Sequence, residues 1–287
     1  MKDRIVMITG ANSGMGLSTA IELARQGARV IMVCRSRERG ERALQEAAQQ
    51  SGSREIRLMI CDLGSLASIR GFAAEFKRSY DRLDVLINNA GVVSIKRELT
   101  ADGFEMMLGV NHLGHFLLTN LLLGHLERST QGRVIVLSSG AHKIGRIHWE
   151  DPTLSRGFSV WKGYAQSKLA NLLFMTELAQ RLKHTNITVN SVHPGAVSTG
   201  LGVNRNTGFG KSIHALLRPF FQTPAEGAST AIYLAASDEV LRTTGQYYYK
   251  KKVSPVSAAA RDRQLAARFW AWSEQEVKLE ESENYFA

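Results

Sequence analysis

Hydrophobic residues fall into two alternating kinds of segment along the first 250 residues of the chain. Short apolar runs rich in β-branched residues are typical of strands that are buried on both faces of a sheet. Between them lie longer segments in which apolar residues recur three and four positions apart, which indicates helices with one buried face, as for Leu17, Ile21 and Ala24. The alternation predicts repeated strand–helix–strand units and therefore a parallel sheet.

The apolar runs predict seven strands, at residues 4–9, 29–34, 56–61, 85–88, 133–138, 187–192 and 246–249. Right-handed crossovers between parallel strands place helices on both faces of such a sheet. We therefore expect the α/β class, with a doubly wound, mostly parallel, seven-stranded sheet of the Rossmann-like type. Ligands of these folds bind at the carboxyl ends of the strands, so the loops after the strands should carry the chemistry.

Neither an internal repeat nor a proline-rich linker divides the chain, so we expect one domain over residues 1–287. Two connections, residues 139–161 and 194–223, are longer than a strand–helix turn requires, and we expect them to be substrate loops. A C-terminal helical extension is predicted at about 256–278, with Leu265, Phe269 and Trp272 on one face. The last few residues are expected to fray.

Composition narrows the class of protein. Hydrophobic residues make up 44% of 287 residues, which is enough for a large core and excludes a disordered chain. Cys34 and Cys61 are too few for a disulfide framework and favour a reducing compartment. A strand-like run follows residues 1–4 directly, and we read no apolar stretch as reaching the roughly 20 residues that span a bilayer. We therefore expect a cytoplasmic protein without a membrane span.

The formal net charge of +10 is the one feature that favours a nucleic-acid partner. The basic residues are scattered along the chain, however, and the longest basic run is Lys250, Lys251 and Lys252. No pattern of a nucleic-acid-binding module accompanies them. We expect a solvated basic surface and no nucleic-acid partner.

A glycine-rich segment, TGANSGMG at residues 9–16, follows the first predicted strand and opens the first helix. Glycine permits a tight turn and a close approach to phosphates, and the amide groups of a helix N-terminus attract anions. The spacing differs from the GxGxxG dinucleotide fingerprint. By itself the segment therefore indicates either a diphosphate site or an ordinary glycine-rich turn.

Further motifs follow in order: Asp62 and Leu63 after the third strand, NNAG at residues 88–91 after the fourth, and Pro194 with Gly195 after the sixth. Together with the glycine-rich loop they resemble the short-chain dehydrogenase/reductase family, whose loop reads TGxxxGxG. Residues 110–119, 167–174 and 254–262 look most like its retinol dehydrogenase branch, which interconverts lipophilic alcohols and aldehydes with NADP(H). Membrane-bound members of that branch carry an apolar N-terminal anchor, which we do not find here.

Tyr164 and Lys168 lie four apart in a predicted helix, so their side chains share a face. A free tyrosine titrates near ~10, and a nearby ammonium group favours its phenolate form. The resemblance implies that Tyr164 donates and accepts the proton and that Lys168 tunes it and binds the nicotinamide ribose. It also implies that Ser139, rather than its neighbour Ser138, hydrogen-bonds the substrate oxygen, and that Asn111 holds a water leading to the lysine. The plain alternative for Asn111 is an exposed helical amide.

Basic residues follow the second strand at Arg35, Arg37 and Arg39, where an NAD-dependent enzyme would place an acidic residue. A guanidinium group can bind the 2′-phosphate of NADP with two hydrogen bonds, although a solvated helix start would look the same. We predict NADP(H) as the preferred cofactor, NAD(H) as possible, and Arg35 as the main contact. The cofactor-binding residues that the resemblance implies are Gly10, Asn12, Ser13, Gly14, Met15, Gly16, Arg35, Asp62, Leu63, Asn89, Ala90, Gly91, Tyr164, Lys168, Pro194, Gly195, Val197 and Thr199.

The predicted function is that of an NADP(H)-dependent oxidoreductase that interconverts a lipophilic alcohol and its aldehyde or ketone. Aromatic residues in the long connections suit such a substrate; they are Trp149, Phe158, Trp161, Phe209, Phe220 and Phe221. The alternative is a noncatalytic NADP(H)-binding regulatory protein on the same fold. An epimerase or dehydratase is less favoured, because such relatives usually add a larger C-terminal domain.

Two further expectations concern metals and association. His112 and His115 are three apart without an acidic or thiol partner, so we predict no metal site. The resemblance implies a homo-oligomer that pairs through the apolar helices near residues 104–128 and 158–182.

Overall fold

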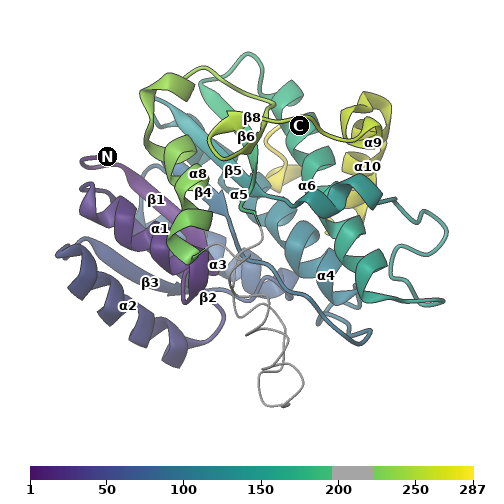
Figure 1. Cartoon of the computed structure of the whole chain (residues 1–287), viewed down its shortest axis with the longest axis horizontal. Coiled ribbons are helices and arrows are strands. Elements are labelled where there is room, and N and C mark those ends of the chain that lie inside the picture. Colours follow the sequence, from purple (N-terminus) through teal and green to yellow (C-terminus); the bar gives the residue numbers. More distant parts are fainter. Residues whose placement is uncertain (196–222) are drawn as a thin grey trace.

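Eight strands form one sheet in the computed structural model, which describes residues 1–195 and 223–287 (Figure 1). The strands are β1 (Ile5–Thr9), β2 (Arg29–Cys34), β3 (Ile56–Ile60), β4 (Val85–Asn88), β5 (Gly132–Leu137), β6 (Ile187–His193), β7 (Tyr247–Tyr249) and β8 (Lys252–Val253). Their order across the sheet is β3-β2-β1-β4-β5-β6-β7-β8. All neighbouring pairs are parallel except β7 and β8, so the predicted doubly wound α/β class is confirmed.

The predicted count of seven strands was one too low. β8 has only two residues and pairs antiparallel with β7 after a reversal in which Lys250 and Lys251 both take positive φ angles. Two residues are too few to show a hydrophobic period, so the pattern of the sequence carries no signal for this strand.

Helices cover both faces of the sheet. One face packs against α1 (Gly14–Arg25), α2 (Arg37–Ser51) and α8 (Pro224–Ala236), and α1 and α8 lie side by side in Figure 1. The other face packs against α3 (Leu66–Ser79), α5 (Gly114–Glu127) and α6 (Val160–Arg181). Each face has its own cluster of buried apolar side chains. The parallel strands lie between these two clusters, so the loops that follow their carboxyl ends lie along one edge of the sheet.

A short helical segment leads into α5. It comprises α4 (Met106–Leu108) and a π-helical turn, η1 (Gly109–Leu113). Over Met106–Glu127 this stretch of 22 residues is long and apolar enough to cross a bilayer, contrary to our expectation that no described segment would be. Of its most apolar window, 94% is buried inside the protein, so it packs as a core element.

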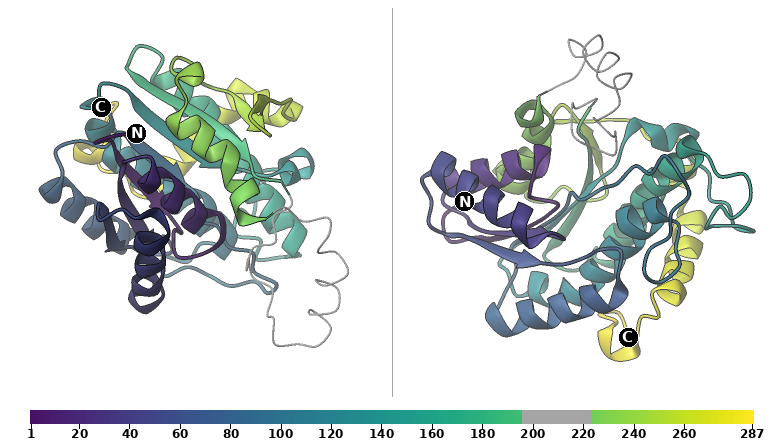
Figure 2. Two further views of the ribbon diagram at one scale, coloured as in Figure 1. Left: turned by 60° about the vertical axis from the view of Figure 1, so that its left-hand side comes forward. Right: turned by 90° about the horizontal axis from the view of Figure 1, so that it is seen from below.

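The C-terminal extension forms α9 (Ala258–Arg261), α10 (Arg263–Glu276) and a 3-10 turn, η5 (Glu281–Glu283), after the turn η4 (Asp238–Val240) that follows α8. α10 packs on α6, as Figure 2 shows at the right. Phe269 is buried as predicted, but its fully buried partner is Trp270 and not Trp272. The reason is that α10 meets both α6 and the tail, so its buried face is wider than the predicted stripe.

The chain end is attached to the fold, contrary to the prediction that it would fray. The Arg70 guanidinium of α3 forms an ion pair of 2.7 Å with Glu283 and donates hydrogen bonds to the carbonyls of Val277 and Lys278. Arg181 of α6 lies 5.4 Å from the ring centroid of Phe286. The sequence pattern indicates only that the tail is acidic and weakly hydrophobic. It does not reveal these contacts, which hold the tail in place.

Candidate active site

The start of α1 differs from the start of the other described helices that follow a loop. α2, α3, α4, α6, α8, α9 and α10 are each capped by a side chain that accepts a hydrogen bond from a first-turn amide. Ser13, at the same position before α1, makes no such bond, and the first turn of α1 holds no acidic residue. These features leave the positive end of the helix free for an external anion, so the loop fits the diphosphate of a dinucleotide.

The glycine-rich loop is packed too closely for side chains. A Cβ atom on Gly16 would lie 2.4 Å from the Gly10 carbonyl oxygen and 2.6 Å from Nδ2 of Asn89. Asn89 in turn donates a hydrogen bond of 2.7 Å to the carbonyl of Thr9. The turn after β4 therefore packs against the loop after β1, so the predicted NNAG segment contacts the predicted phosphate loop.

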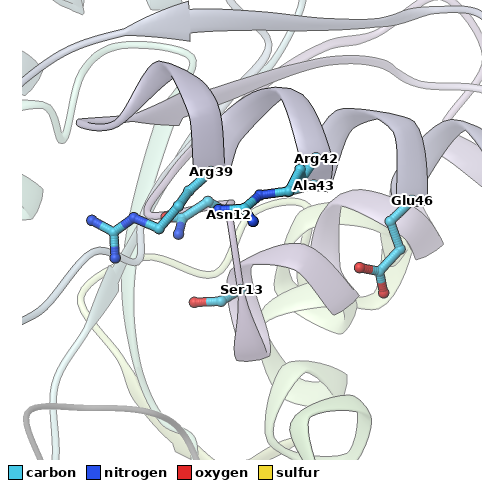
Figure 3. A pocket seen from close by; sticks show the side chains of 6 residues that line it. All are labelled: Asn12, Ser13, Arg39, Arg42, Ala43 and Glu46. Carbon is cyan, nitrogen blue, oxygen red and sulfur yellow. The ribbon is translucent and has the colours of Figure 1, made fainter. Parts of the chain in front are cut away.

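A hollow of about 260 Å³ lies beside this loop (Figure 3). Asn12 and Ser13 line one side, and Arg39, Arg42, Ala43 and Glu46 of α2 line the other. Arg35, the predicted main contact, is exposed at the end of β2 and is not among the residues that line the hollow. Sequence reasoning noted Arg39 and missed Arg42, although their spacing of three on one helix could have indicated a shared face.

The other predicted cofactor residues lie along the same edge of the sheet. Asp62 is half-buried and accepts a hydrogen bond of 2.9 Å from the amide of Gly64, while Leu63 is buried. Gly195 follows β6 with a φ of +85°, which favours glycine. Val197 and Thr199 lie outside the described residues. Met15 and Gly14 begin α1, and Ala90 and Gly91 follow Asn89.

Tyr164 and Lys168 lie on one face of α6, and the Lys168 Nζ atom is 5.5 Å from the centroid of the tyrosine ring. The ammonium group is buried and donates a hydrogen bond of 3.4 Å to the carbonyl of Leu137 at the end of β5. Ser138 is also buried and donates to the carbonyl of Lys168 at 2.8 Å. Ser139 is half-buried and hydrogen-bonds the Tyr164 side chain. Ser139, and not Ser138, therefore faces the tyrosine.

Burial acts on both titratable groups. It raises the pKa of Tyr164, and the hydrogen bond with Ser139 opposes that rise. It lowers the pKa of Lys168 to about 8. The expected lowering of the Tyr164 pKa by the ammonium group is not found, because Lys168 lies over the ring and desolvation outweighs the hydrogen bond at the hydroxyl. The tyrosine is therefore protonated at neutral pH in the free protein.

Asn111 is fully buried in the π-helical turn, and not the exposed amide of the plain alternative. Its side-chain oxygen accepts a hydrogen bond of 2.7 Å from the amide of Val92, and its nitrogen donates to the Val92 carbonyl and to the hydroxyl of Ser167. A Cβ atom on Gly91 would lie 3.6 Å from Oδ1 of Asn111 and 3.7 Å from Nζ of Lys168. The missing side chain of Gly91 thus leaves room between these two polar groups.

The remaining predictions concern the aromatic residues of the long connections and the absence of a metal site. Trp149 of the 139–161 connection packs its ring against Phe269 and lies 3.9 Å from the Arg268 guanidinium, so it supports α10. Trp161 is exposed and Phe158 is half-buried, while Phe209, Phe220 and Phe221 lie outside the described residues. Within the described ranges, histidine, cysteine and acidic residues form no cluster that could hold a metal ion.

Comparisons with known proteins agree with this arrangement. A family model for short chain dehydrogenases matches residues 4–208. Retinol dehydrogenase 14 of Homo sapiens is 46% identical over 302 residues, which cover 97% of this chain and 88% of that protein. Dehydrogenase/reductase SDR family member 13 of Bos taurus is 44% identical, and the match covers 94% of this chain and 72% of that protein.

Solved structures share the fold. A putative uncharacterized protein from Mycobacterium paratuberculosis is similar with a TM-score of 0.77 and 38% identity, over 96% of this chain and 94% of that one. A putative short chain dehydrogenase from Shigella flexneri 2a, complexed with NADP, has a TM-score of 0.69 and 25% identity, over 88% of this chain and 98% of that one. The chain therefore belongs to the short-chain dehydrogenase/reductase family of oxidoreductases, in its retinol dehydrogenase branch.

Proposed function

We propose that the protein interconverts a lipophilic alcohol and its aldehyde or ketone with NADP(H). The observation that carries this proposal is the meeting of Ser139, Tyr164, Lys168 and Asn111 beside the loops that fit a dinucleotide. The names of the relatives, retinol dehydrogenases among them, support an alcohol with a large apolar part as substrate. When bound, the nicotinamide ring supplies the hydride for reduction or accepts it in oxidation.

Each side chain has a separate task in this proposal. The Tyr164 hydroxyl gives its proton to the carbonyl oxygen as the alcohol forms, and takes it back in the reverse direction. Ser139 donates a hydrogen bond to the same oxygen as negative charge develops there. The Lys168 ammonium stabilises the tyrosinate that remains after proton transfer, and Asn111 keeps the turn at Val92 open beside the lysine.

Preference for NADP(H) is supported by the arginines near the hollow, and by Arg39 above all, because Arg42 pairs with Glu38 at 3.2 Å and Glu46 also lines the hollow. Arg39 and Arg42 face Ser13 across it, Arg35 stands at the end of β2, and a short chain dehydrogenase of similar structure was solved with NADP. Arginine suits a phosphate because its planar group offers paired donors. We therefore assign the 2′-phosphate to Arg39 together with Arg35, and not to Arg35 alone.

The cofactor assignment is tested with Arg35→Asp and Arg39→Asp. Each should lower kcat/KM for NADPH relative to NADH by about tenfold or more, because each removes a charge-assisted contact worth roughly 1.5–3 kcal/mol. Arg37→Asp is the matched control: Arg37 lies on the same helix, is exposed and does not line the hollow. An NADPH/NADH ratio that is equal in all four proteins contradicts the assignment.

The reaction itself is tested by NADPH oxidation with a panel of short and lipophilic carbonyl compounds. We expect turnover that increases with the length of the apolar chain. A panel that gives no turnover with either cofactor, although NADPH binds, favours the noncatalytic regulatory protein instead.

The compartment is also part of the proposal. Cys34 and Cys61 are buried and free, and burial raises the pKa of their thiols to about 11 and about 12. Such thiols are unreactive whatever the compartment. The support for the reducing cytoplasm is that both cysteines are free, because disulfides are rare there.

A further inference from the structure

His115 stands between three parts of the site and has no role in the reaction described so far. It lies in the first turn of α5, directly after the π-helical turn, and its side chain is 1% exposed. The ring nitrogen Nε2 is 2.8 Å from the hydroxyl of Thr9, and Nδ1 is 3.0 Å from the backbone carbonyl of Asn111. Both nitrogens of a buried imidazole are thus engaged.

The partners fix which nitrogen carries the proton. A carbonyl oxygen can only accept a hydrogen bond, so Nδ1 donates to Asn111 and the unprotonated Nε2 accepts from the Thr9 hydroxyl. The Thr9 oxygen lies 2.8 Å from Nε2 and 3.4 Å from its other acceptor, the Ile87 carbonyl, so the bond to the histidine is the stronger one. Burial lowers the pKa of His115 to about 4, so the ring is neutral near neutral pH and this tautomer persists. The Thr9 oxygen in turn accepts hydrogen bonds of 2.9 Å from the amides of Asn89 and Ala90.

One imidazole therefore joins the end of β1, the NNAG turn after β4 and the backbone of Asn111. Thr9 immediately precedes the glycine-rich loop, and Asn89 and Ala90 belong to the turn that supports it. The π-helical turn that holds Asn111 ends two residues before His115, and such turns recur at functional sites.

We propose that His115 is a positioning residue, which holds Asn111 on one side and the cofactor turn on the other through its two ring nitrogens. This inference rests on the proposed function. The histidine touches neither substrate nor cofactor in this account: its Nδ1 bond keeps Asn111 beside Lys168, and its Nε2 bond keeps Thr9 aligned for the amides of the NNAG turn.

His112, one turn earlier, provides a control with the same residue type and depth. It is also 1% exposed, but its Nε2 is 2.9 Å from the hydroxyl of Ser273 in α10, and its ring packs among Phe116, Phe174 and Phe269. It therefore connects the π-helical turn to the C-terminal extension and not to the cofactor turn.

Two substitutions separate the two bonds of His115. In His115→Asn the amide nitrogen is as many bonds from Cα as Nδ1 is, and Asn120 already makes the same bond to a carbonyl four residues earlier at 2.8 Å. This variant keeps the bond to Asn111 and loses the bond to Thr9. In His115→Gln the side-chain oxygen is as many bonds from Cα as Nε2 is, so the bond to Thr9 is kept instead.

The experiment measures the NADPH dissociation constant by fluorescence titration and kcat at saturating NADPH, in wild type, both variants and His112→Asn. We expect His115→Asn to weaken NADPH binding at least fivefold with kcat within twofold, and His115→Gln to lower kcat at least fivefold with binding within twofold. His112→Asn should change neither. Equal losses in His112→Asn, or no loss in either His115 variant, overturn the inference.

The outcome also separates this inference from the function on which it rests. If wild type binds NADPH but reduces no carbonyl, the proposed function fails, while the NADPH dissociation constants of His115→Asn and His112→Asn still decide whether His115 positions the cofactor turn.

Discussion

The charge of Lys168 is the one in the site that is most sensitive to pH, because burial lowers the pKa of its ammonium group to about 8. Tyr164 is affected in the opposite direction, since burial raises its pKa and keeps it protonated. The first group to lose its proton as the pH rises is therefore the lysine. The ammonium form is present below about pH 8 and is lost above it.

This order predicts the pH dependence of carbonyl reduction. The value of kcat/KM, which reports groups of the free enzyme, should fall as the pH rises through about 8, because the stabilising ammonium charge disappears. In Lys168→Arg the side chain keeps its charge to much higher pH. The fall in kcat/KM should therefore occur at a higher pH than in wild type, whatever the maximal rate of the variant. An unmoved profile in Lys168→Arg contradicts the assignment.

The two neighbouring serines predict different defects. Ser139→Ala should lower kcat by about 10²–10³-fold, because it removes a hydrogen bond to the developing oxyanion. Ser138→Ala should leave kcat nearly unchanged and lower the free energy of unfolding by about 1 kcal/mol, since the buried Ser138 hydroxyl binds the Lys168 carbonyl. Steady-state kinetics and thermal unfolding of both variants test this, and a reversed pattern would exchange the two roles.

At this scale the sequence predicted which residues meet but not how they are arranged. Spacing placed Tyr164 and Lys168 on one face, and the structure has them there. It could not predict that Arg39 and Arg42 lie opposite Ser13, or that His115 binds Thr9, because these contacts join segments more than 25 residues apart in the sequence.

Among the elements, α10 depends most on one side chain. Trp270 is 1% exposed, stacks on Phe174 and lies 4.6 Å from the Arg181 guanidinium. Trp270→Ala should lower the free energy of unfolding by about 3–5 kcal/mol, because it leaves a large cavity between α6 and α10. Trp161→Ala is the control: that side chain is 70% exposed, so the change should be within about 0.5 kcal/mol.

Chemical denaturation of both tryptophan variants measures this difference directly. Similar stability losses in the two proteins contradict the docking of α10 described above.

Strands were the elements that the sequence predicted best, with boundaries within one residue for all seven. A strand that is buried on both faces needs a continuous run of apolar residues, so the ends of each run in the sequence mark the ends of the strand. The π-helical turn was predicted only as helix, since a single extra residue in an apolar helix barely changes the hydrophobic period. The attached tail was missed because its contacts are made by arginine side chains of distant helices.

For the whole molecule, the packing within one chain limits which parts of α5 and α6 are free to pair between subunits. Helices α5 and α6 were predicted to pair between subunits, yet α10 of the same chain packs on α6, and 94% of the most apolar window of Met106–Glu127 is buried. A homo-oligomer thus stays a prediction, and it must use a surface other than the parts of these helices that α10 covers.

The excess of basic residues has a partly internal explanation. Arg133 is buried and donates to the carbonyls of Leu234 and Ser237, Arg70 holds the chain end, and Arg181 packs on aromatic rings. Of these three, only Arg133 is buried, and Arg70 and Arg181 are each paired with a carboxylate, Glu283 and Glu177. The net charge of +10 is therefore weak support for a nucleic-acid partner.

The most direct measurement of the central claim compares wild type and Tyr164→Phe in two assays: NADPH binding by fluorescence titration, and hydride transfer to a lipophilic aldehyde in a single turnover. We expect NADPH affinity within about twofold of wild type and a transfer rate reduced by about 10²–10⁴-fold, because only the proton donor is removed. A variant that transfers hydride at the rate of wild type would contradict it.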